Sequence, residues 1–300
     1  MSDGQVLVDA HHHVWDLDLR PQPWLDEPGH EPIRRSFSSL ALRSAATRPI
    51  AGRRLTSTVV VQCVTSVPET RDLLALAESD PLIGAVVGWA DLTSPAIGDV
   101  LDDLRAGSAG RYLRAVRHIV QGESDSHWLQ RPDVERGLRA VGERGLGYDV
   151  LIRSHQLPQA IRLAERLPEL PLVLDHAGKP PLARRELTEW ARQVRALARN
   201  AQVRCKVSGL VTEAEHEKWT VDDIRPAWDV LLSAFGPDRL MFGSDWPVCV
   251  LAGGWNRWAA TVEELLYGCS GPEIHAVLAG TATAFYHLTS APTKEGTLCS

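Results

Sequence analysis

The sequence predicts a single-domain α/β protein with the (β/α)8 TIM-barrel fold. Eight short apolar runs, rich in valine, leucine and isoleucine, alternate with segments of helical periodicity along 300 residues. Short runs that are apolar on both faces are typical of buried parallel strands. The length suits one large barrel, and no glycine-rich dinucleotide fingerprint follows the first run, which disfavours an open doubly wound sheet.

The strands are expected where the apolar runs lie. These runs are 6–10, 58–63, 82–90, 113–120, 148–152, 172–174, 203–207 and 240–242. Between them, apolar stripes within 134–141, 187–198 and 224–235 have the spacing of amphipathic helices. We therefore expect a barrel domain over residues 1–289 and a flexible C-terminal tail over 290–300.

Two long irregular segments follow expected strands, 16–36 and 121–131. Segments that follow the strands of a barrel lie over its C-terminal mouth, where binding and catalytic residues gather. We expect both segments to act as lids or as walls of a pocket.

Composition excludes several classes of partner. Hydrophobic residues make up 44% of the chain, its formal net charge is −6, and no basic stripe is present. These features argue against nucleic acid or an anionic membrane as the main partner. No apolar run reaches the length of a membrane span, and the first strand begins too early for a signal peptide to precede it. None of the five cysteines forms a Cys-x-x-Cys pair, so we expect reduced thiols and a cytoplasmic protein.

The first strand ends in three consecutive histidines. Side chains alternate along a strand, so His11 and His13 are expected on one face and His12 on the other. Two imidazoles on one face can share a small cation or a polarised oxygen. A solvated histidine cluster or a tag remnant is the alternative, and the apolar strand around the histidines disfavours it.

Polar or titratable groups end nearly every other expected strand as well. In chain order these groups are Gln62, Trp89, Arg117, His118, Arg153, His155, His176, Lys206, Ser208 and Asp245. The carboxyl ends of barrel strands converge on one mouth, so the sequence predicts a functional site there.

Several phrases of the sequence resemble the amidohydrolase superfamily. The His-x-His pair of strand one, His176 after strand six and Asp245 after strand eight match its pattern. The wording is most similar to the lactonase branch, which includes L-fuconolactone and L-rhamnonolactone hydrolases. The phrases that carry this likeness are Val8-Asp-Ala-His-His-His13, Pro23-Trp-Leu25, Val86-Val-Gly-Trp89, Arg114-Ala-Val-Arg-His118, Leu174-Asp-His-Ala-Gly-Lys-Pro-Pro181, Cys205-Lys-Val-Ser-Gly-Leu210 and Met241-Phe-Gly-Ser-Asp-Trp-Pro247.

The resemblance implies an enzyme that opens a cyclic sugar-acid ester with water. Asp245 would accept the proton of the attacking water, and His176 and His118 would be further catalytic groups. A metal site would comprise His11, His13, His176 and Asp245, and its ion would be one zinc. Without a metal, Arg117, His118 or a histidine pair would stabilise the oxyanion. The two-metal members use a strand-four lysine, which this chain lacks, so we reject a binuclear centre.

Substrate-binding roles are expected for Trp24, Trp89, Arg117, Lys179 and His155. Each has a plainer alternative. The tryptophans could be ordinary packing, Lys179 could be a surface residue, and His155 could be a loop histidine or a further ligand. Arg117 and His118 alternate faces, so only one can point into the barrel. Lys206 is either a buried ion-pair partner or a substrate contact.

The expected partner is a small lactone, and the oligomeric state stays open. One alternative function is a metal-dependent decarboxylase of an aromatic or related acid, which Arg117 and Arg153 keep in consideration. Another is a non-catalytic sugar-binding barrel.

Overall fold

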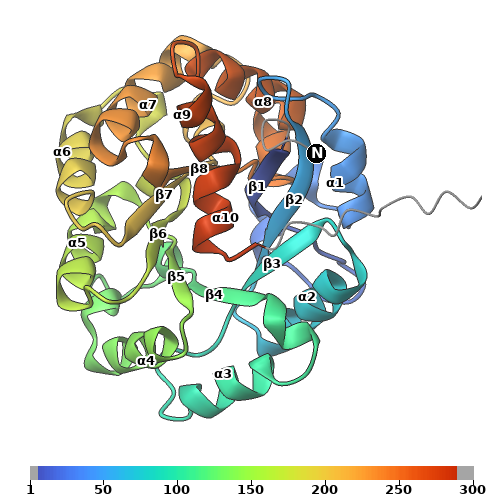
Figure 1. Ribbon diagram of the computed structural model, residues 1–300, viewed down its shortest axis with the longest axis vertical. Coiled ribbons are helices and arrows are strands. Elements are labelled where there is room, and N and C mark those ends of the chain that lie inside the picture. Colours follow the sequence, from blue (N-terminus) through green and yellow to red (C-terminus); the bar gives the residue numbers. More distant parts are fainter. Residues whose placement is uncertain (1–5, 289–300) are drawn as a thin grey trace, which may run out of the picture.

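Eight parallel strands form one sheet in chain order, from β1 to β8, and helices surround it (Figure 1). The computed structural model describes residues 6–288. The strands are β1 Val6–His12, β2 Arg54–Val61, β3 Ile83–Gly88, β4 Leu113–His118, β5 Gly147–Val150, β6 Leu172–Leu174, β7 Val203–Val207 and β8 Leu240–Phe242. A parallel bridge between His12 and Trp246 joins β1 to the segment after β8. The predicted single-domain barrel is therefore confirmed.

The helices alternate with the strands, as the apolar stripes predict. They are α1 Ser39–Ala45, α2 Val67–Ser79, α3 Ile97–Arg105, α4 Pro132–Glu143, α5 Leu157–Arg166, α6 Leu187–Leu197, α7 Val221–Phe235, α8 Gly254–Leu265, α9 Gly271–His275 and α10 Thr281–Phe285. Helix α7 shows why they form. A capping box between Thr220 and Asp223 starts it, and its buried face includes Trp228 and Leu231.

Strand β2 is the clearest difference from the sequence prediction, because it begins at Arg54 rather than at residue 58. Residues 54–57 are polar or only partly buried, so they carry little apolar signal. They are nevertheless paired with β1, with Arg54 opposite Val6 and Ser57 opposite Val8. Pairing with a neighbouring strand, not hydrophobicity, sets the start of this strand.

One end of the barrel interior is apolar and is closed by the last helices that the structure describes, α9 and α10. A helical segment formed by α9, the π-helical turn Ala276–Gly280 and α10 crosses the barrel in Figure 1. Its Ala279, Ala282 and Tyr286 join a buried cluster with residues of β1, β2, β3, β4, β6 and β8. The strand members of that cluster are Val8, Ala10, Val59, Val61, Ala85, Val87, Ala115, Val173 and Met241. A polar site inside the barrel must therefore lie beyond this apolar cluster, on the side away from α10.

No helix within residues 6–288 has the length and apolar character needed to cross a membrane. The predicted flexible tail, 290–300, lies outside the described residues.

Candidate active site

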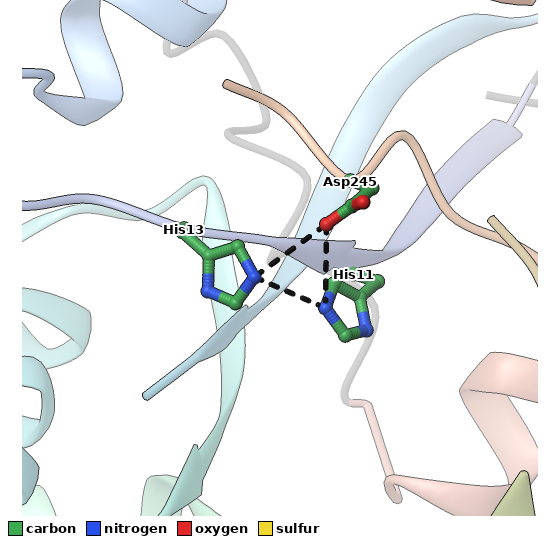
Figure 2. Close-up of side chains that lie close together, drawn as sticks. All are labelled: His11, His13 and Asp245. Atoms are coloured by element: carbon green, nitrogen blue, oxygen red, sulfur yellow. Dashed lines mark hydrogen bonds and ion pairs between the residues drawn. The ribbon is translucent and has the colours of Figure 1, made fainter. Parts of the chain in front are cut away.

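His11, His13 and Asp245 meet at the ends of β1 and β8 (Figure 2). The two Nε2 atoms of His11 and His13 are 3.2 Å apart. The Oδ1 atom of Asp245 lies 3.7 Å from Nε2 of His11 and 3.6 Å from Nε2 of His13. All three side chains are buried. The structure thus brings together three of the four residues that the resemblance assigns to a metal.

An irregularity in β1 aims the two imidazoles at Asp245. Val8 and Ala10 belong to the apolar cluster inside the barrel, so strict alternation would place His12 beside them. The register between β1 and β2 shifts between Asp9 and His12, and a shift of this kind redirects the following side chains. His12 instead contacts Thr58, with 2.9 Å between its Nε2 and Oγ1 of Thr58.

Backbone geometry sets the positions of the residues after β6 and β8. His176 and Asp245 have positive φ angles, 51° and 54°, which are uncommon for residues with a side chain. Such strained residues persist only where the surrounding structure holds them, and they cluster at functional sites. Here the amide of Asp245 donates to the carbonyl oxygen of His11 at 2.8 Å.

Asp245 is a carboxylate at neutral pH. Burial alone would raise its pKa, but the imidazoles of His176, His13 and His11 lower that pKa below its ordinary value. Burial lowers the pKa of His176 to about 4 and also lowers the pKa of His11. At pH 7 the site therefore combines one carboxylate, which can accept a proton, with the neutral imidazoles of His11 and His176.

Gly209 leaves the space that His176 occupies. The Nδ1 atom of His176 lies 2.9 Å from Oγ of Ser208, which orients the ring. A Cβ atom at Gly209 would stand 2.6 Å from that Nδ1 and 3.0 Å from Oδ2 of Asp245. Gly209 also has a φ of +61°, so a residue with a side chain would be strained there.

A buried group of alternating charges lies against His11. The Lys206 ammonium is 2.5 Å from Oδ2 of Asp149 and 3.0 Å from Oδ1 of Asp175. Arg117 places Nη1 3.1 Å from Oδ2 of Asp175, and the hydroxyl of Tyr286 donates to Asp149 at 2.9 Å. Lys206 is therefore a buried ion-pair partner, and Arg117, not His118, is the strand-four residue that points inward.

The two carboxyl groups of this cluster differ in pKa. Burial raises the pKa of Asp149 to about 6, although Lys206 counteracts the rise. Burial acts in the same direction on Asp175, but Lys206, His11 and Arg117 together lower its pKa below the usual value. Asp175 therefore keeps its negative charge and anchors both cations.

Asp9 supports the turn that carries Asp245. Its carboxyl oxygens accept hydrogen bonds from the amide of Ser244 at 2.8 Å and from its hydroxyl at 2.6 Å. Burial raises the pKa of Asp9 to about 7. The centre thus includes a carboxyl group that positions the backbone next to Asp245.

His118 lies on the other face of β4, and both of its ring nitrogens are engaged. The indole N–H of Trp89 donates to Nδ1 at 3.1 Å, and Nε2 lies 2.7 Å from Oε1 of Glu123. The ring of Trp128 stacks on the imidazole with a centroid separation of 4.1 Å. These contacts hold the segment after β4 against the end of β3.

The remaining expected substrate contacts lie farther out. Trp24 is partly buried, and its indole ring packs edge-on against Trp15 with a centroid separation of 5.4 Å. Lys179 pairs with Glu213, with 3.5 Å between Nζ and Oε1. His155 is exposed. No contact with the three-residue centre is recorded for these side chains within residues 6–288.

The spacing of the ligand atoms of His11, His13 and Asp245 matches one zinc ion. Tetrahedral zinc with bonds of about 2.0–2.1 Å separates its ligand atoms by roughly 3.3–3.4 Å. The three separations of 3.2, 3.6 and 3.7 Å are close to that value. His11 also approaches Asp175 and His176 as a second group of ligand type, but Lys206 and Arg117 already contact that carboxylate.

Sequence reasoning did not single out Asp149, Tyr286 or Glu123. Asp149 had a detectable signal, because it is a charged residue within a strand that is otherwise apolar. A buried lysine on another strand, Lys206, required such a partner. Tyr286 and Glu123 had no such signal, since both lie outside the strands, Tyr286 in the turn after α10 and Glu123 in the irregular segment after β4.

A family model described as "Amidohydrolase" matches residues 8–288 of this chain. The chain belongs to the amidohydrolase family. The amidohydrolase is 36% identical over 296 residues to an L-fucono-1,5-lactonase of Burkholderia multivorans, and the match covers 95% of this chain and 97% of that protein. It is 33% identical over 285 residues to an L-fucono-1,5-lactonase of Burkholderia ambifaria, with 94% and 95% covered.

A solved structure resembles this amidohydrolase over nearly the whole barrel. It is the crystal structure of an amidohydrolase from Burkholderia multivorans with bound zinc. The two superpose with a TM-score of 0.88 at 35% identity, covering 95% of this chain and all of the other. The expected superfamily and fold are thereby confirmed.

Proposed function

We propose that this protein is a hydrolase that opens a sugar-acid lactone, with an L-fuconolactone or a related aldonolactone as its substrate. The observation that carries the proposal is a buried, ionised carboxylate, Asp245, held beside the imidazoles of His11 and His13 at the mouth of the barrel. Two relatives named as L-fucono-1,5-lactonases, similar over nearly their whole length, support the same substrate class.

In the proposed reaction, Asp245 accepts a proton from a water molecule that attacks the lactone carbonyl. A general base of this kind contributes about 10²–10⁴-fold to the rate. Attack produces a tetrahedral oxyanion, which imidazole N–H groups of the site can stabilise. Asp245 then returns its proton to the ring oxygen, which leaves as the hydroxyl of the open acid.

His176 is proposed to face the reacting carbonyl from the side opposite His13. Its Nδ1 is engaged with Ser208, which leaves Nε2 for a substrate or a ligand. His118 is proposed to act through the pocket wall, since Trp89 and Glu123 occupy its nitrogens. Trp24, Trp89, Lys179 and His155 are proposed to contact the sugar at the rim of the pocket. Arg117 is proposed to act on the substrate indirectly, through its contact with His11.

Zinc is the proposed ion if the protein binds a metal. His11, His13 and Asp245 would hold it, with His176 beside them. A bound zinc would lower the pKa of a water molecule and polarise the carbonyl.

A panel of aldonolactones, run with and without a chelator, tests the proposal through proton release at constant pH. Hydrolysis of a sugar lactone by the wild-type protein, and its loss in Asp245→Asn, is the expected result. Release of carbon dioxide from benzoates without any lactone hydrolysis would instead identify a decarboxylase. Binding of a sugar lactone without turnover would identify a binding protein.

A further inference from the structure

We propose that Lys206 fixes the ring of His11 in the tautomer that carries its proton on Nε2, and that this tautomer opposes metal binding. The inference concerns the same centre as the proposed function and rests on it only for the identity of the substrate. Lys206 and His11 are both completely buried. They lie on β7 and β1, which are far apart in the sequence.

The Lys206 end of the contact allows only one direction of hydrogen bonding. Nζ of Lys206 lies 3.1 Å from Nδ1 of His11. An ammonium group has hydrogens to donate and no lone pair to accept with, so Nδ1 must be the acceptor. A neutral imidazole with a bare Nδ1 carries its one hydrogen on Nε2.

The contacts of His13 lead independently to the same tautomer of His11. Nδ1 of His13 lies 2.7 Å from the carbonyl oxygen of Val61, which can only accept, so that nitrogen carries the hydrogen. Nε2 of His13 is then bare and can accept from Nε2 of His11, 3.2 Å away. From Lys206 through His11 and His13 to Val61, every hydrogen meets an acceptor.

Two longer contacts of His11 compete with this series. Nδ1 of His11 is 3.4 Å from Oδ1 of Asp175, which would favour a hydrogen on Nδ1. Nη1 of Arg117 is 3.4 Å from Nε2 and would favour a bare Nε2. Nη1 of Arg117 carries two hydrogens, so it can donate one to Asp175 at 3.1 Å and direct the other toward His11. Both competing contacts of His11 are nevertheless longer than its contacts with Lys206, at 3.1 Å, and with His13, at 3.2 Å.

Metal binding would require the opposite tautomer. An ion bound by His11 and His13 needs the lone pair of Nε2, so the proton would have to leave or move to Nδ1, where it would meet the Lys206 ammonium. In metal sites the second nitrogen usually donates to a carboxylate or a carbonyl oxygen. Without a metal, the Nε2–H of His11 is a donor directed at the space beside Asp245, where the lactone oxyanion would form.

Nitrogen NMR of the metal-free protein, labelled with ¹⁵N at histidine, reads the tautomers directly. We expect His11 with its hydrogen on Nε2 and His13 with its hydrogen on Nδ1, the His11 signals being assigned by their absence in His11→Gln. A hydrogen on Nδ1 of His11 overturns the proposal. The variant serves only to assign the signals, and the tautomers are read from the wild-type protein.

Zinc affinity, measured by competition with a chromophoric chelator, tests the consequence. The double variant Lys206→Met/Asp149→Asn removes the ammonium together with one carboxylate, so the buried charge stays balanced. We expect it to bind zinc about tenfold or more tightly than the wild type, and the matched control Asp149→Asn to show no such gain.

Equal zinc affinity in the wild type and the double variant overturns the link to metal binding, as does an equal gain in the control. A protein that hydrolyses no lactone would overturn the proposed function while leaving the tautomer result intact, so the two failures are distinguishable.

Discussion

The backbone amide of Asp245 donates to the carbonyl oxygen of His11, with 2.8 Å between nitrogen and oxygen. The amide of His13 likewise donates to the carbonyl oxygen of Trp246 at 2.7 Å. These two bonds join β1 to the segment after β8, so they close the barrel at the centre of the site. The distance between the proposed base and the imidazoles is therefore fixed by main-chain pairing.

Asp245→Asn should reduce kcat for a lactone substrate by about 10²–10⁴-fold, because an amide cannot accept the proton of water. Asparagine tolerates a positive φ angle, so the turn at φ +54° should persist. Steady-state kinetics with a sugar lactone measures the loss. An unfolding midpoint close to that of the wild type shows that the fold is retained, whereas undiminished kcat would contradict the assignment of the base.

Gly209→Ala should abolish most of the activity, because the new Cβ would displace His176 and crowd Asp245. Gly145 provides a matched control. Its φ of +67° is close to that of Gly209, so a side chain there carries a backbone penalty of about 1 kcal/mol, but no atom lies within 4 Å of a Cβ built there. Activity and urea unfolding of both variants separate the two effects. Equal activity in the two variants would show that the contact with His176 has no catalytic consequence.

Tyr286→Phe should destabilise the protein by about 1–3 kcal/mol, because it leaves Asp149 without the hydroxyl that donates to it. Tyr148→Phe is the comparison. Tyr148 is equally buried, but its hydroxyl has no hydrogen-bond partner among the described residues, so its loss should be neutral or slightly stabilising. Urea unfolding at pH 7 measures both. A cost in Tyr148→Phe as large as that in Tyr286→Phe would refute the role of Asp149.

The metal-free protein should lose stability below pH 6.5 through its buried histidines. Burial lowers the pKa of His12 to about 3 in the folded state. Between pH 3 and 6.5 the unfolded state therefore binds the extra proton, so folding stability rises with pH in that window. His12→Gln should remove this contribution, which amounts to about 2–3 kcal/mol between pH 6.5 and 4.5.

Urea unfolding of the wild type and of His12→Gln, at half-unit steps of pH, measures that difference. Asp9 has a raised pKa and acts in the opposite direction between pH 4 and 7, but it is common to both proteins and cancels in the comparison. Parallel pH profiles for the two proteins would contradict the assignment to His12.

The barrel could be predicted from the sequence because each strand is a short run of residues buried on both faces. Strands such as β6, Leu172–Leu174, and β8, Leu240–Phe242, contain only apolar residues. The pairing of His11 with His13, and their meeting with Asp245, followed from strand alternation and from the convergence of strand ends.

The register shift in β1 could not be predicted in the same way. Alternation from Val8 and Ala10 predicts that His12 shares their face, and the shift is visible only in the pairing with β2. The partners of Lys206 were equally hidden, because which carboxylates lie opposite a buried lysine depends on the arrangement of strands around the barrel.

The hydroxyl of Tyr286 bonds to Asp149, which holds Lys206 against His11. The turn after α10 thus supports a centre that is built from residues of the first strand. Residue 286 must have emerged from the ribosome before this support exists. During synthesis, the contact between Lys206 and His11 therefore lacks this support until Tyr286 has emerged.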